Sequence, residues 1–378
     1  MQHGDEAPSS PRIAVVLAGD ATDPRTWSGV PAGLSSGLVA AGAEPFPIDA
    51  RFPGAAKVAH VLGMSWVDEA TNPVFAAGGG FRASTAIRTV GRIDGAVMMG
   101  SGYSLAIKAP IVTFEDMTVV QALDQPGPPY ASVSEPAARR WRARQRRNYR
   151  HSRGCCVASR WAARSVHEDY GVDPAKIHVV GFGRNAEPQL VNRDWKTPHF
   201  LFVGGDWERK RGPAVVEAFA EVRRHQPNAT LDLVGGHPAI DVPGVTGHGM
   251  LSLGTAEGRE QHAALLARAT CMVLPSAYEP FGITYLDAGA TGAPSIGTTV
   301  GGAPGAVGDG GVVVDPHDQD ALVRAMLELA DPSTAKAHGE RAFAHSSLFT
   351  WQAFAERLLR ALRPAGVDIS RLAGFLES

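Results

Sequence analysis

The 378-residue sequence has little cysteine, no long hydrophobic run and no marked excess of charge of either sign. Its cysteines are Cys155, Cys156 and Cys271, an odd number with two members adjacent, which argues against a disulfide framework and for a reducing, cytoplasmic location. No stretch approaches the roughly 18 uninterrupted apolar residues of a membrane-spanning helix. Lysine and arginine number 36 against 38 acidic residues, a net charge of −2, which argues against a dedicated nucleic-acid-binding protein.

What is present is an ordinary globular composition, with 44% hydrophobic and 20% charged residues and a length that suggests two domains or one large one. Residues 1–11 are polar, and we expect a flexible tail rather than a secretory signal there. Short apolar runs that end in Gly or Ser alternate with amphipathic stretches, which is typical of strands buried on both faces and of the helices that cover them. The expected strands are residues 13–17, 96–99, 155–158, 177–180, 200–203, 230–234, 271–274 and 312–314.

A polar, proline-containing segment between residues 183 and 199 interrupts the apolar runs, and we interpret it as a linker. Repeated strand–helix–strand units on both sides of it predict an α/β protein with two Rossmann-like, doubly wound domains, residues 12–190 and 191–347. The carboxyl ends of their parallel strands are expected to face each other across a cleft. The stretch FTWQAFAERLLRAL predicts a strongly amphipathic helix near the C-terminus.

The most informative segment is PSAYEPFGITYLDAGATGAP, in which a strand runs into a turn with Pro280 and Gly282 and a helix begins near Ile283. Such a turn presents free backbone amides and the positive end of a helix dipole, which suits a phosphate. Glu279 and Asp287 would flank that phosphate, and a carboxylate accepts hydrogen bonds from sugar hydroxyls. An ordinary helix end with one solvated acid and one capping acid is an equal alternative.

A second segment, FVGGDWERKRG, follows the first strand of the second half. Its glycines let a ligand approach the backbone, and Arg209, Lys210 and Arg211 place cations just before a helix. Clustered cations at a strand-to-helix turn complement a diphosphate. A solvated basic turn would explain this segment alone, but two phosphate-type turns in one domain favour the diphosphate.

Together with TLDLVGG and VGGAPGAV, these segments resemble the donor half of a retaining glycosyltransferase of family 4, which has the GT-B fold. The resemblance covers residues 198–331 well and the first half more loosely, through TWSGVP and VASRWAARSVHEDYGVDPAKIHVVGFGRN. It implies that residues 12–190 bind the acceptor and residues 191–347 bind the donor. It also implies that the closing helical segment, residues 348–378, returns to the first domain.

The resemblance implies a role for each matching residue. Glu279 would hold hydroxyls of the transferred sugar, Asp287 would hold the ribose, and Lys210 with Arg209 would neutralise the leaving diphosphate. Gly29 corresponds to the loop that closes over the reaction centre. Apart from the resemblance, His248 is expected to be a structural or surface group, and its place at the end of an expected strand would let it border the base pocket. The implied donor-binding set is Gly29, Gly204, Gly205, Arg209, Lys210, Gly235, His248, Glu279, Pro280, Phe281, Gly282, Ile283 and Asp287, with the nucleotide-diphosphate sugar as co-substrate and no metal or other cofactor.

The chain departs from the family pattern at three places. Asp287 stands where the family usually has a second Glu, and Gly205 stands where Arg often follows the strand-ending glycine. No His occurs in residues 91–134, where many members place one near the transferred sugar. In the segment TFEDMT we name Asp116 as the polar group that faces the sugar, with Glu115 as second choice. Capping of the following helix by these acids is an equal alternative.

Three weaker signals are interpreted more simply. The Asp318-Gln319-Asp320 motif opens a helix, so we expect capping rather than metal binding. The segment GFGRNA resembles a dinucleotide fingerprint, but the Glu-Pro that follows argues against a helix there. The basic run AARRWRARQRRNYRHSR is expected to be a solvated helix face beside the cleft, with an acceptor-phosphate site or peripheral contact with an anionic membrane as less favoured alternatives.

We therefore predict a retaining, metal-independent glycosyltransferase that moves a sugar from a nucleotide-diphosphate sugar to an acceptor hydroxyl. Two alternatives stay open: a sugar-nucleotide epimerase on the same fold, and a catalytically inactive protein that binds nucleotide sugars. No nucleic-acid partner is expected. Glu279, Lys210, Arg209 and Asp116 are the predicted catalytic residues.

Overall fold

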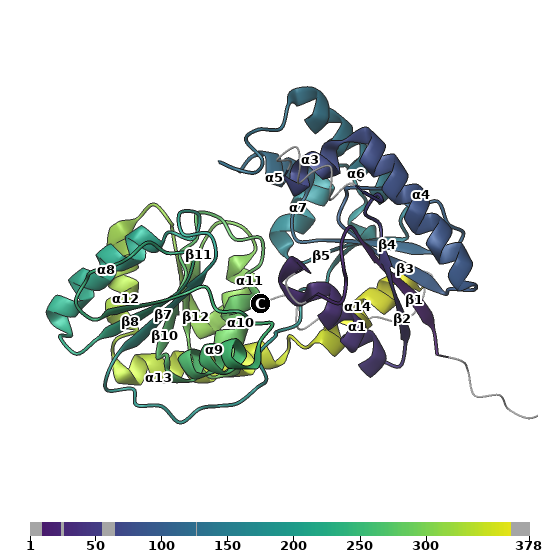
Figure 1. Cartoon of the computed structure of the whole chain (residues 1–378). Helices are drawn as coiled ribbons and strands as arrows, with labels where there is room; N and C mark the ends of the chain where they lie inside the picture. Colours follow the sequence, from purple (N-terminus) through teal and green to yellow (C-terminus); the bar gives the residue numbers. More distant parts are fainter. Residues whose placement is uncertain (1–9, 24–25, 55–64, 126, 364–378) are drawn as a thin grey trace, which may run out of the picture.

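The structure, a computed structural model, describes residues 10–23, 26–54, 65–125 and 127–363. It contains two six-stranded parallel sheets, with strand orders β2-β1-β3-β4-β5-β6 and β12-β11-β10-β7-β8-β9. Figure 1 shows the two sheets as the centres of two α/β domains that lie side by side. The predicted fold class is confirmed. Most of the expected tail, residues 1–9 of 1–11, and residues 364–378 of the closing segment lie outside the described residues.

The first domain is built from the first sheet and the helices that cover its two faces. Alternate residues of one strand show this arrangement: Val15 and Leu17 pack into the core beneath α1 and α14, whereas Val16 packs into a second core with Ile87 of α4. The elements are β1 (Arg12–Leu17), η1 (Thr26–Gly29), α1 (Val30–Ala40), β2 (Glu44–Asp49), α3 (Trp66–Thr71), α4 (Pro73–Val90), β3 (Gly95–Met99), β4 (Ile111–Glu115), α5 (Val119–Leu123), α6 (Glu135–His151), β5 (Gly154–Val157), α7 (Arg160–Glu168), η2 (Pro174–Lys176) and β6 (Ile177–Val179).

The second domain repeats the scheme after the linker. No helix begins between β6 and β7, as the failed dinucleotide fingerprint predicts. Asp318 accepts a hydrogen bond from the Ala321 amide (2.8 Å), which confirms that it caps a helix. The elements are β7 (His199–Gly204), α8 (Gly212–His225), β8 (Thr230–Gly235), β9 (Val245–Gly249), α9 (Ala256–Arg268), β10 (Cys271–Val273), α10 (Ile283–Ala290), β11 (Ser295–Thr298), α11 (Ala303–Val307), η3 (Gly308–Gly310), β12 (Gly311–Val314), α12 (Gln319–Glu328), α13 (Pro332–Ser347) and α14 (Trp351–Leu362).

The C-terminal helix α14 returns to the first domain, where it lies against α1 (Figure 1). Two glycines of α1 make this close approach feasible. A Cβ atom on Gly37 would lie 2.1 Å from the carbonyl oxygen of Trp351, and one on Gly33 would lie 2.3 Å from its indole ring. Since real Cβ atoms do not come so close, only glycine lets the two helices pack at this distance.

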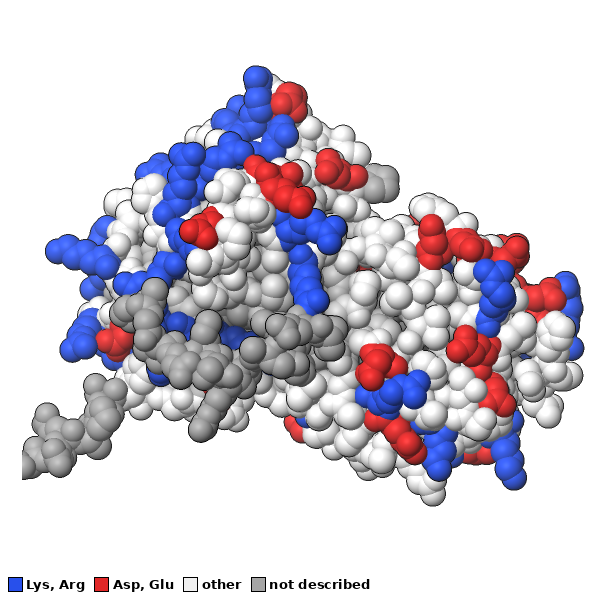
Figure 2. Space-filling view, turned by 180° about the vertical axis from the view of Figure 1, so that it is seen from behind, with Lys and Arg blue, Asp and Glu red and all other residues white. Residues whose placement is uncertain are grey.

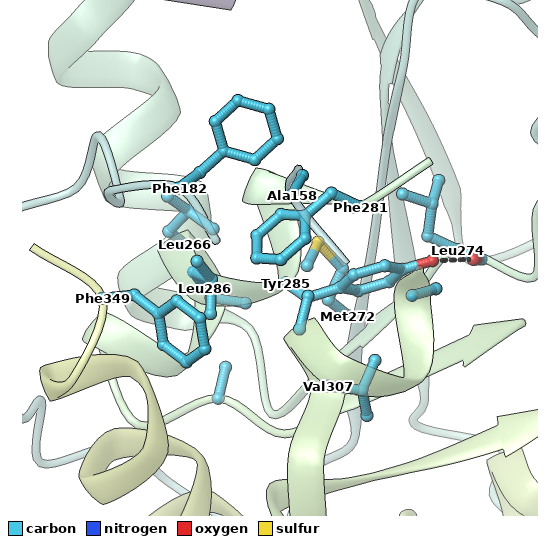
Figure 3. Packing of buried hydrophobic residues seen from close by; sticks show 14 of the residues in the cluster. Ala158, Phe182, Leu266, Met272, Leu274, Phe281, Tyr285, Leu286, Val307 and Phe349 are labelled. Atoms are coloured by element: carbon cyan, nitrogen blue, oxygen red, sulfur yellow. Dashed lines mark hydrogen bonds between the residues drawn. The ribbon is translucent and has the colours of Figure 1, made fainter. Parts of the chain in front are cut away.

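A continuous aromatic core joins the two domains. Phe182 at the end of the first domain lies 5.2 Å from the Phe114 ring and 5.0 Å from the Phe281 ring, which belongs to the turn before α10. Phe354 of α14 lies 4.9 Å from Phe114 on the same side. Figure 3 shows Phe182, Phe281 and Phe349 side by side next to α10. Buried rings of this size contribute strongly to stability, so the core fixes the domains against each other.

Candidate donor and acceptor site

The turn before α10 is held by its own side chains. Gly282 adopts a left-handed conformation (φ 94°), and a Cβ atom there would lie 2.3 Å from the Tyr285 ring. Tyr285 in turn donates a hydrogen bond to the Leu274 carbonyl (2.7 Å), the dashed line in Figure 3. The helix therefore begins at Ile283, as predicted, and its first turn points at the carboxyl end of β10.

Glu279 is buried at this turn and surrounded by polar groups. Its Oε2 atom lies 3.3 Å from Lys210 Nζ and 3.7 Å from Arg209 Nη1, and it accepts a hydrogen bond from the Ser276 hydroxyl (3.3 Å). The Glu279 backbone is also fixed, because its amide donates to the Val300 carbonyl (3.1 Å). The structure thus brings together the acid and the two cations that the sequence assigned to one site.

Arg209 joins the turn before α8 to the turn before α10 through hydrogen bonds. Its Nη1 atom donates to the Tyr278 carbonyl (2.9 Å), and its own carbonyl accepts from the Ala277 amide (2.7 Å). The guanidinium lies over the Tyr278 ring, 5.2 Å from the centroid, and its Nε is 3.4 Å from Asp206. Arg209 is therefore held in place by both turns, whereas Lys210 reaches Glu279 through its terminal ammonium alone.

The glycines of these turns allow tight packing of the backbone. Gly235, at the end of β8, has φ 122°, and a Cβ there would lie 1.9 Å from the Gly204 carbonyl oxygen. A Cβ on Gly204 would lie 2.6 Å from Lys210 Cδ. Gly205 has open space in the Cβ direction, so no described residue lies within 4 Å of the position that its Cβ would take.

The helices that begin at this site lack side-chain caps. α8 follows Arg211 and α10 follows Gly282, both in the left-handed region, and neither residue caps the helix with its side chain. By contrast α9, α12, α13 and α14 are capped by Thr255, Asp318, Asp331 and Thr350. An N-terminus without a side-chain cap offers its amides and dipole to an anion. The alternative that Glu279 or Asp287 caps α10 is wrong.

Asp287 is buried one turn into α10 and holds the linker. Its Oδ1 accepts hydrogen bonds from the backbone amides of Asn185 (2.7 Å) and Ala186 (2.8 Å). Burial raises the pKa of its carboxyl to about 6, while the two amides and the nearby Arg184 favour the charged form. The predicted ribose ligand thus also has a structural task, and Oδ2 is the oxygen not occupied by these two amides.

His248 lies in another polar group. Its Nε2 is 2.8 Å from Asp232 Oδ1, and Gln261 lies 3.4 Å from its Nδ1. Asp232 also binds Arg268. The structure therefore places His248 with the acid of β8, and it does not bring His248 together with Glu279.

In the first domain Asp116 lines a cavity at the end of β4, and Trp27 donates to its Oδ2 from Nε1 (3.3 Å). Burial raises the pKa of Asp116, and Glu279 across the cleft adds to this rise. Glu115 is buried and accepts from the Tyr149 hydroxyl (2.7 Å) and from Gln145. The helix α5 is capped by Thr118, so the alternative that these acids cap it is wrong.

The loop that contains Gly29 has an unusual backbone. Trp27, Ser28 and Gly29 all have positive φ (46°, 54° and 81°), a conformation that is costly for the two non-glycine residues and is maintained by surrounding contacts. The Ser28 carbonyl accepts a hydrogen bond from Asn185 Nδ2 (3.3 Å), so the loop and the linker touch. Gly29 directly precedes α1, which also lacks a side-chain cap.

Sequence reasoning missed the aromatic residues around the site, namely Trp27, Tyr130 and Tyr278. Burial raises the pKa of Tyr130, and Asp116 of the first domain and Arg209 of the second also act on it. Trp27 could have been identified from the sequence, because it lies close to Gly29 in the segment TWSGVP. Tyr130 and Tyr278 could not, since nothing in the local sequence distinguishes them from other tyrosines in loops.

The basic run of α6 is only partly a solvated face. Figure 2 shows basic side chains gathered over the first domain, and Arg139, Arg140 and Arg147 are exposed members of the run. Arg144, however, donates to the carbonyls of Ser101 (2.8 Å) and Ala70, and Arg153 donates to the Leu362 carbonyl (2.8 Å). For these two arginines the predicted solvated role is wrong, because they tie loops and α14 to the first domain.

Two absences apply to the described ranges alone. Residues 10–23, 26–54, 65–125 and 127–363 contain no group of three or more His, Cys, Asp or Glu side chains arranged to hold a metal ion. Within the same ranges no helix is both long and apolar enough to cross a membrane.

Two parallel-sheet domains that face a cleft, with phosphate-type turns in the second, define a GT-B glycosyltransferase fold. The sucrose-phosphate synthase of Thermosynechococcus elongatus has this architecture: it superposes with a TM-score of 0.66 at 18% identity, covering 93% of this chain and 98% of its own. Residues 197–331, within the second domain, match the family model described as Glycosyl transferases group 1. The resemblance to family 4 glycosyltransferases is confirmed.

Curated relatives match part of the chain. A glycogen synthase of Mycobacterium tuberculosis is 32% identical over 202 residues, which cover 50% of this chain and 49% of that protein. A D-inositol 3-phosphate glycosyltransferase of Segniliparus rotundus is 31% identical over 223 residues, which cover 52% and 49%. The chain thus spans about half the length of the curated relatives it matches.

Proposed function

We propose that this protein is a retaining glycosyltransferase that moves a sugar from a nucleotide-diphosphate sugar to an acceptor hydroxyl. One observation carries the proposal: Lys210 and Arg209 meet Glu279 at two helix N-termini without side-chain caps. Cations and free amides suit a diphosphate, and a buried carboxylate beside them suits sugar hydroxyls. The glycosyltransferase names of the matching relatives support the same conclusion.

In the proposed reaction, the bond between the sugar C1 and the diphosphate oxygen breaks as the acceptor oxygen bonds to C1 from the same face. The acceptor proton passes to a phosphate oxygen of the leaving diphosphate, so no enzymatic nucleophile is required. Negative charge grows on the diphosphate in the transition state, where Lys210, Arg209 and the N-termini of α8 and α10 would stabilise it more than in the ground state. Protein cations thus do the work that a metal does in other transferases.

Glu279 and Asp116 would hold the sugar from opposite sides of the cleft. Glu279 would accept hydrogen bonds from sugar hydroxyls, and Asp116, oriented by Trp27, would bind a hydroxyl near the reacting carbon. Asp287 would use Oδ2 for the ribose while Oδ1 holds the linker. The closeness of the linker to the ribose position would couple donor binding to the relative position of the domains.

The proposal is tested by incubating the protein with UDP-, GDP-, ADP- and dTDP-sugars, with and without EDTA, and measuring release of the nucleoside diphosphate. We expect release from at least one donor, unaffected by EDTA and lost in Lys210→Ala. The anomeric configuration of the product by NMR tests retention. An epimerised sugar nucleotide formed without any acceptor would point to an epimerase, and donor binding with no turnover against any acceptor would indicate an inactive binding protein.

A further inference from the structure

The first domain contains a cavity of about 490 Å³ at the carboxyl ends of β1, β3 and β4, beside Asp116. This volume is within the range of pockets that bind a molecule of drug size. The reaction proposed above uses Asp116 and Trp27 at one side of the cavity and leaves the rest without a role. The residues that line the cavity indicate which class of molecule it binds.

Aromatic rings dominate the walls. Phe52 and Phe75 are stacked (centroids 5.9 Å apart, 18° between planes), and Trp66 meets both Tyr130 and Trp141 edge to face. The aromatic lining residues are Trp27, Phe52, Trp66, Phe75, Tyr103, Tyr130 and Trp141. Rings arranged in this way bind flat apolar molecules through their faces and edges.

The polar atoms of these rings are mostly occupied within the protein. Tyr103 donates its hydroxyl to the Val16 carbonyl (2.6 Å), and Trp141 donates Nε1 to the Ser101 hydroxyl (3.0 Å). Trp27 donates to Asp116. A bound molecule therefore meets carbon surface from these three side chains rather than hydrogen-bond donors, and this surface suits an apolar ring better than a sugar with a hydroxyl on every carbon.

The cavity carries no excess of positive charge. Arg51 is the only Lys or Arg among the described residues that line it, and its Nε lies 3.5 Å from Glu69. Glu115 is buried, and its pKa is raised to about 8, so it contributes no charge at neutral pH. Asp116 is the remaining acid, at the side that faces Glu279. With a single arginine against the two acids Glu69 and Asp116, the walls carry no excess of positive charge, and this disfavours a phosphate.

From this geometry, and resting on the proposed function, we infer that the acceptor is a hydroxyl-bearing ring compound, aromatic or alicyclic, without a phosphate group. Its ring would lie against the aromatic lining that includes Phe75 and Trp66, and its hydroxyl would reach Asp116, on which Glu279 of the donor site acts. The matching relative from Segniliparus rotundus is named for inositol 3-phosphate, a phosphorylated ring. The acceptor inferred here differs from that compound because it carries no phosphate.

Two glycines of α4, the helix that carries Phe75, allow it to pack closely beside the cavity. A Cβ on Gly78 would lie 2.1 Å from the Phe52 ring, and one on Gly79 would lie 2.2 Å from the Ala50 carbonyl oxygen. These glycines cost helix stability but let α4 approach the end of β2, which places Phe52 and Phe75 in contact. Gly78→Ala would push the Phe52 ring and change the shape of the pocket without altering its charge.

The test measures binding of 2-naphthol and a monohydroxylated flavone to the full chain by calorimetry, beside myo-inositol 1-phosphate, glucose and 1-decanol. We expect the two ring compounds to bind and the other three to bind at least about tenfold more weakly, which is about 1.4 kcal/mol. Phe75→Ala is expected to weaken ring binding about tenfold. Phe81→Ala is the matched control, because Phe81 is an exposed residue of the same helix and does not line the cavity.

Nucleoside diphosphate binding is measured on the same samples to separate the two claims. Nucleotide binding that is unchanged in Phe75→Ala, together with transfer to the ring hydroxyl, supports the acceptor assignment. Preferential binding of the inositol phosphate or of decanol, or equal loss in Phe75→Ala and Phe81→Ala, overturns it while the proposed function stands. Ring binding without affinity for any nucleoside diphosphate overturns the proposed function, and the acceptor role falls with it.

Discussion

Lys210 Nζ lies 3.3 Å from Glu279 Oε2, and both side chains are nearly buried where the α8 turn meets the α10 turn. The two residues are 69 positions apart, so the pair exists only because β7 and β10 are neighbours in the second sheet. Arg209 supports the same carboxylate from 3.7 Å. A cation and an acid side by side at two helix N-termini form the centre of the proposed donor site.

Replacing Lys210 with alanine is expected to lower kcat/KM by about a hundredfold or more, because one cation that stabilises the leaving diphosphate is lost. The fold should survive, since Arg209 still faces Glu279. Thermal melting checks the fold, and initial rates of nucleoside diphosphate release check the activity. Lys196→Ala, which removes an exposed lysine of the same domain, should leave the rate unchanged. A Lys210→Ala rate near that of Lys196→Ala would remove the assigned role.

Asp116→Asn should reduce sugar transfer by about ten- to a hundredfold while nucleotide affinity is retained, because in the proposed reaction Asp116 would bind the sugar from the first domain, whereas the nucleotide would bind to the second. Steady-state kinetics and calorimetry with the nucleoside diphosphate separate the two effects. Asp124→Asn, at the far end of α5, is the control. If Asp116→Asn lost nucleotide binding instead, its place beside the transferred sugar would be wrong.

Asp287→Ala is expected to lower the free energy of unfolding by about 1–3 kcal/mol, because two linker amides lose their acceptor. Asp287→Asn keeps an oxygen that can accept these bonds and should cost less. Both variants should weaken nucleotide binding, since the ribose contact needs the carboxylate. Denaturant titration and calorimetry measure the two effects, and equal stability of both variants with the wild type would show that the linker does not depend on Asp287.

Glu115 makes stability depend on pH. Burial raises its pKa in the folded chain to about 8, well above its value of about 4.3 in an unfolded chain, so the folded state keeps a proton that the unfolded state releases. The wild-type free energy of unfolding should therefore fall as the pH rises from about 4 to about 8. Glu115→Gln carries no such proton, so its stability relative to the wild type should improve over this interval.

Denaturant titrations of both proteins at pH 5 and pH 8 measure this change. Glu217→Gln, at an exposed position of α8, should show no comparable change with pH. A Glu115→Gln variant whose stability relative to the wild type stays constant, or worsens toward pH 8, would mean that Glu115 is ionised in the fold.

Much of the fold follows from the sequence, because runs such as residues 13–17 and 271–274 are apolar throughout and end in turn residues. β2 escapes this reasoning since Pro45 and Pro47 interrupt it, and the sheet tolerates them because β2 is an edge strand. β11 escapes it for the opposite reason: its Ser295 and Thr298 look polar, yet the strand is buried inside the sheet. For both β2 and β11, the position of the strand in the sheet decides which residues it tolerates, and the local sequence does not show that position.

The candidate site can be predicted where charged residues follow neighbouring strands of one parallel sheet. Glu279, Lys210 and Arg209 sit at strand-to-helix turns of one sheet, so their meeting follows from topology. The hydrogen bonds of Asp287 to the linker and the choice between Asp116 and Glu115 do not, because they depend on which way a side chain turns at a strand end. The aromatic cavity is lined by residues from distant segments of the first domain, so no local sequence pattern predicts it.

The most direct test of the account is a thermal-shift measurement of the full chain with UDP, GDP, ADP and dTDP and with the corresponding nucleosides. A diphosphate at 100 times its dissociation constant adds about 2.7 kcal/mol of stability, so at least one should raise the melting temperature clearly. We predict that its nucleoside does not, and that Lys210→Ala abolishes the shift. No shift with any diphosphate, or an equal shift with the nucleoside, would contradict a diphosphate site at Lys210, Arg209 and Glu279.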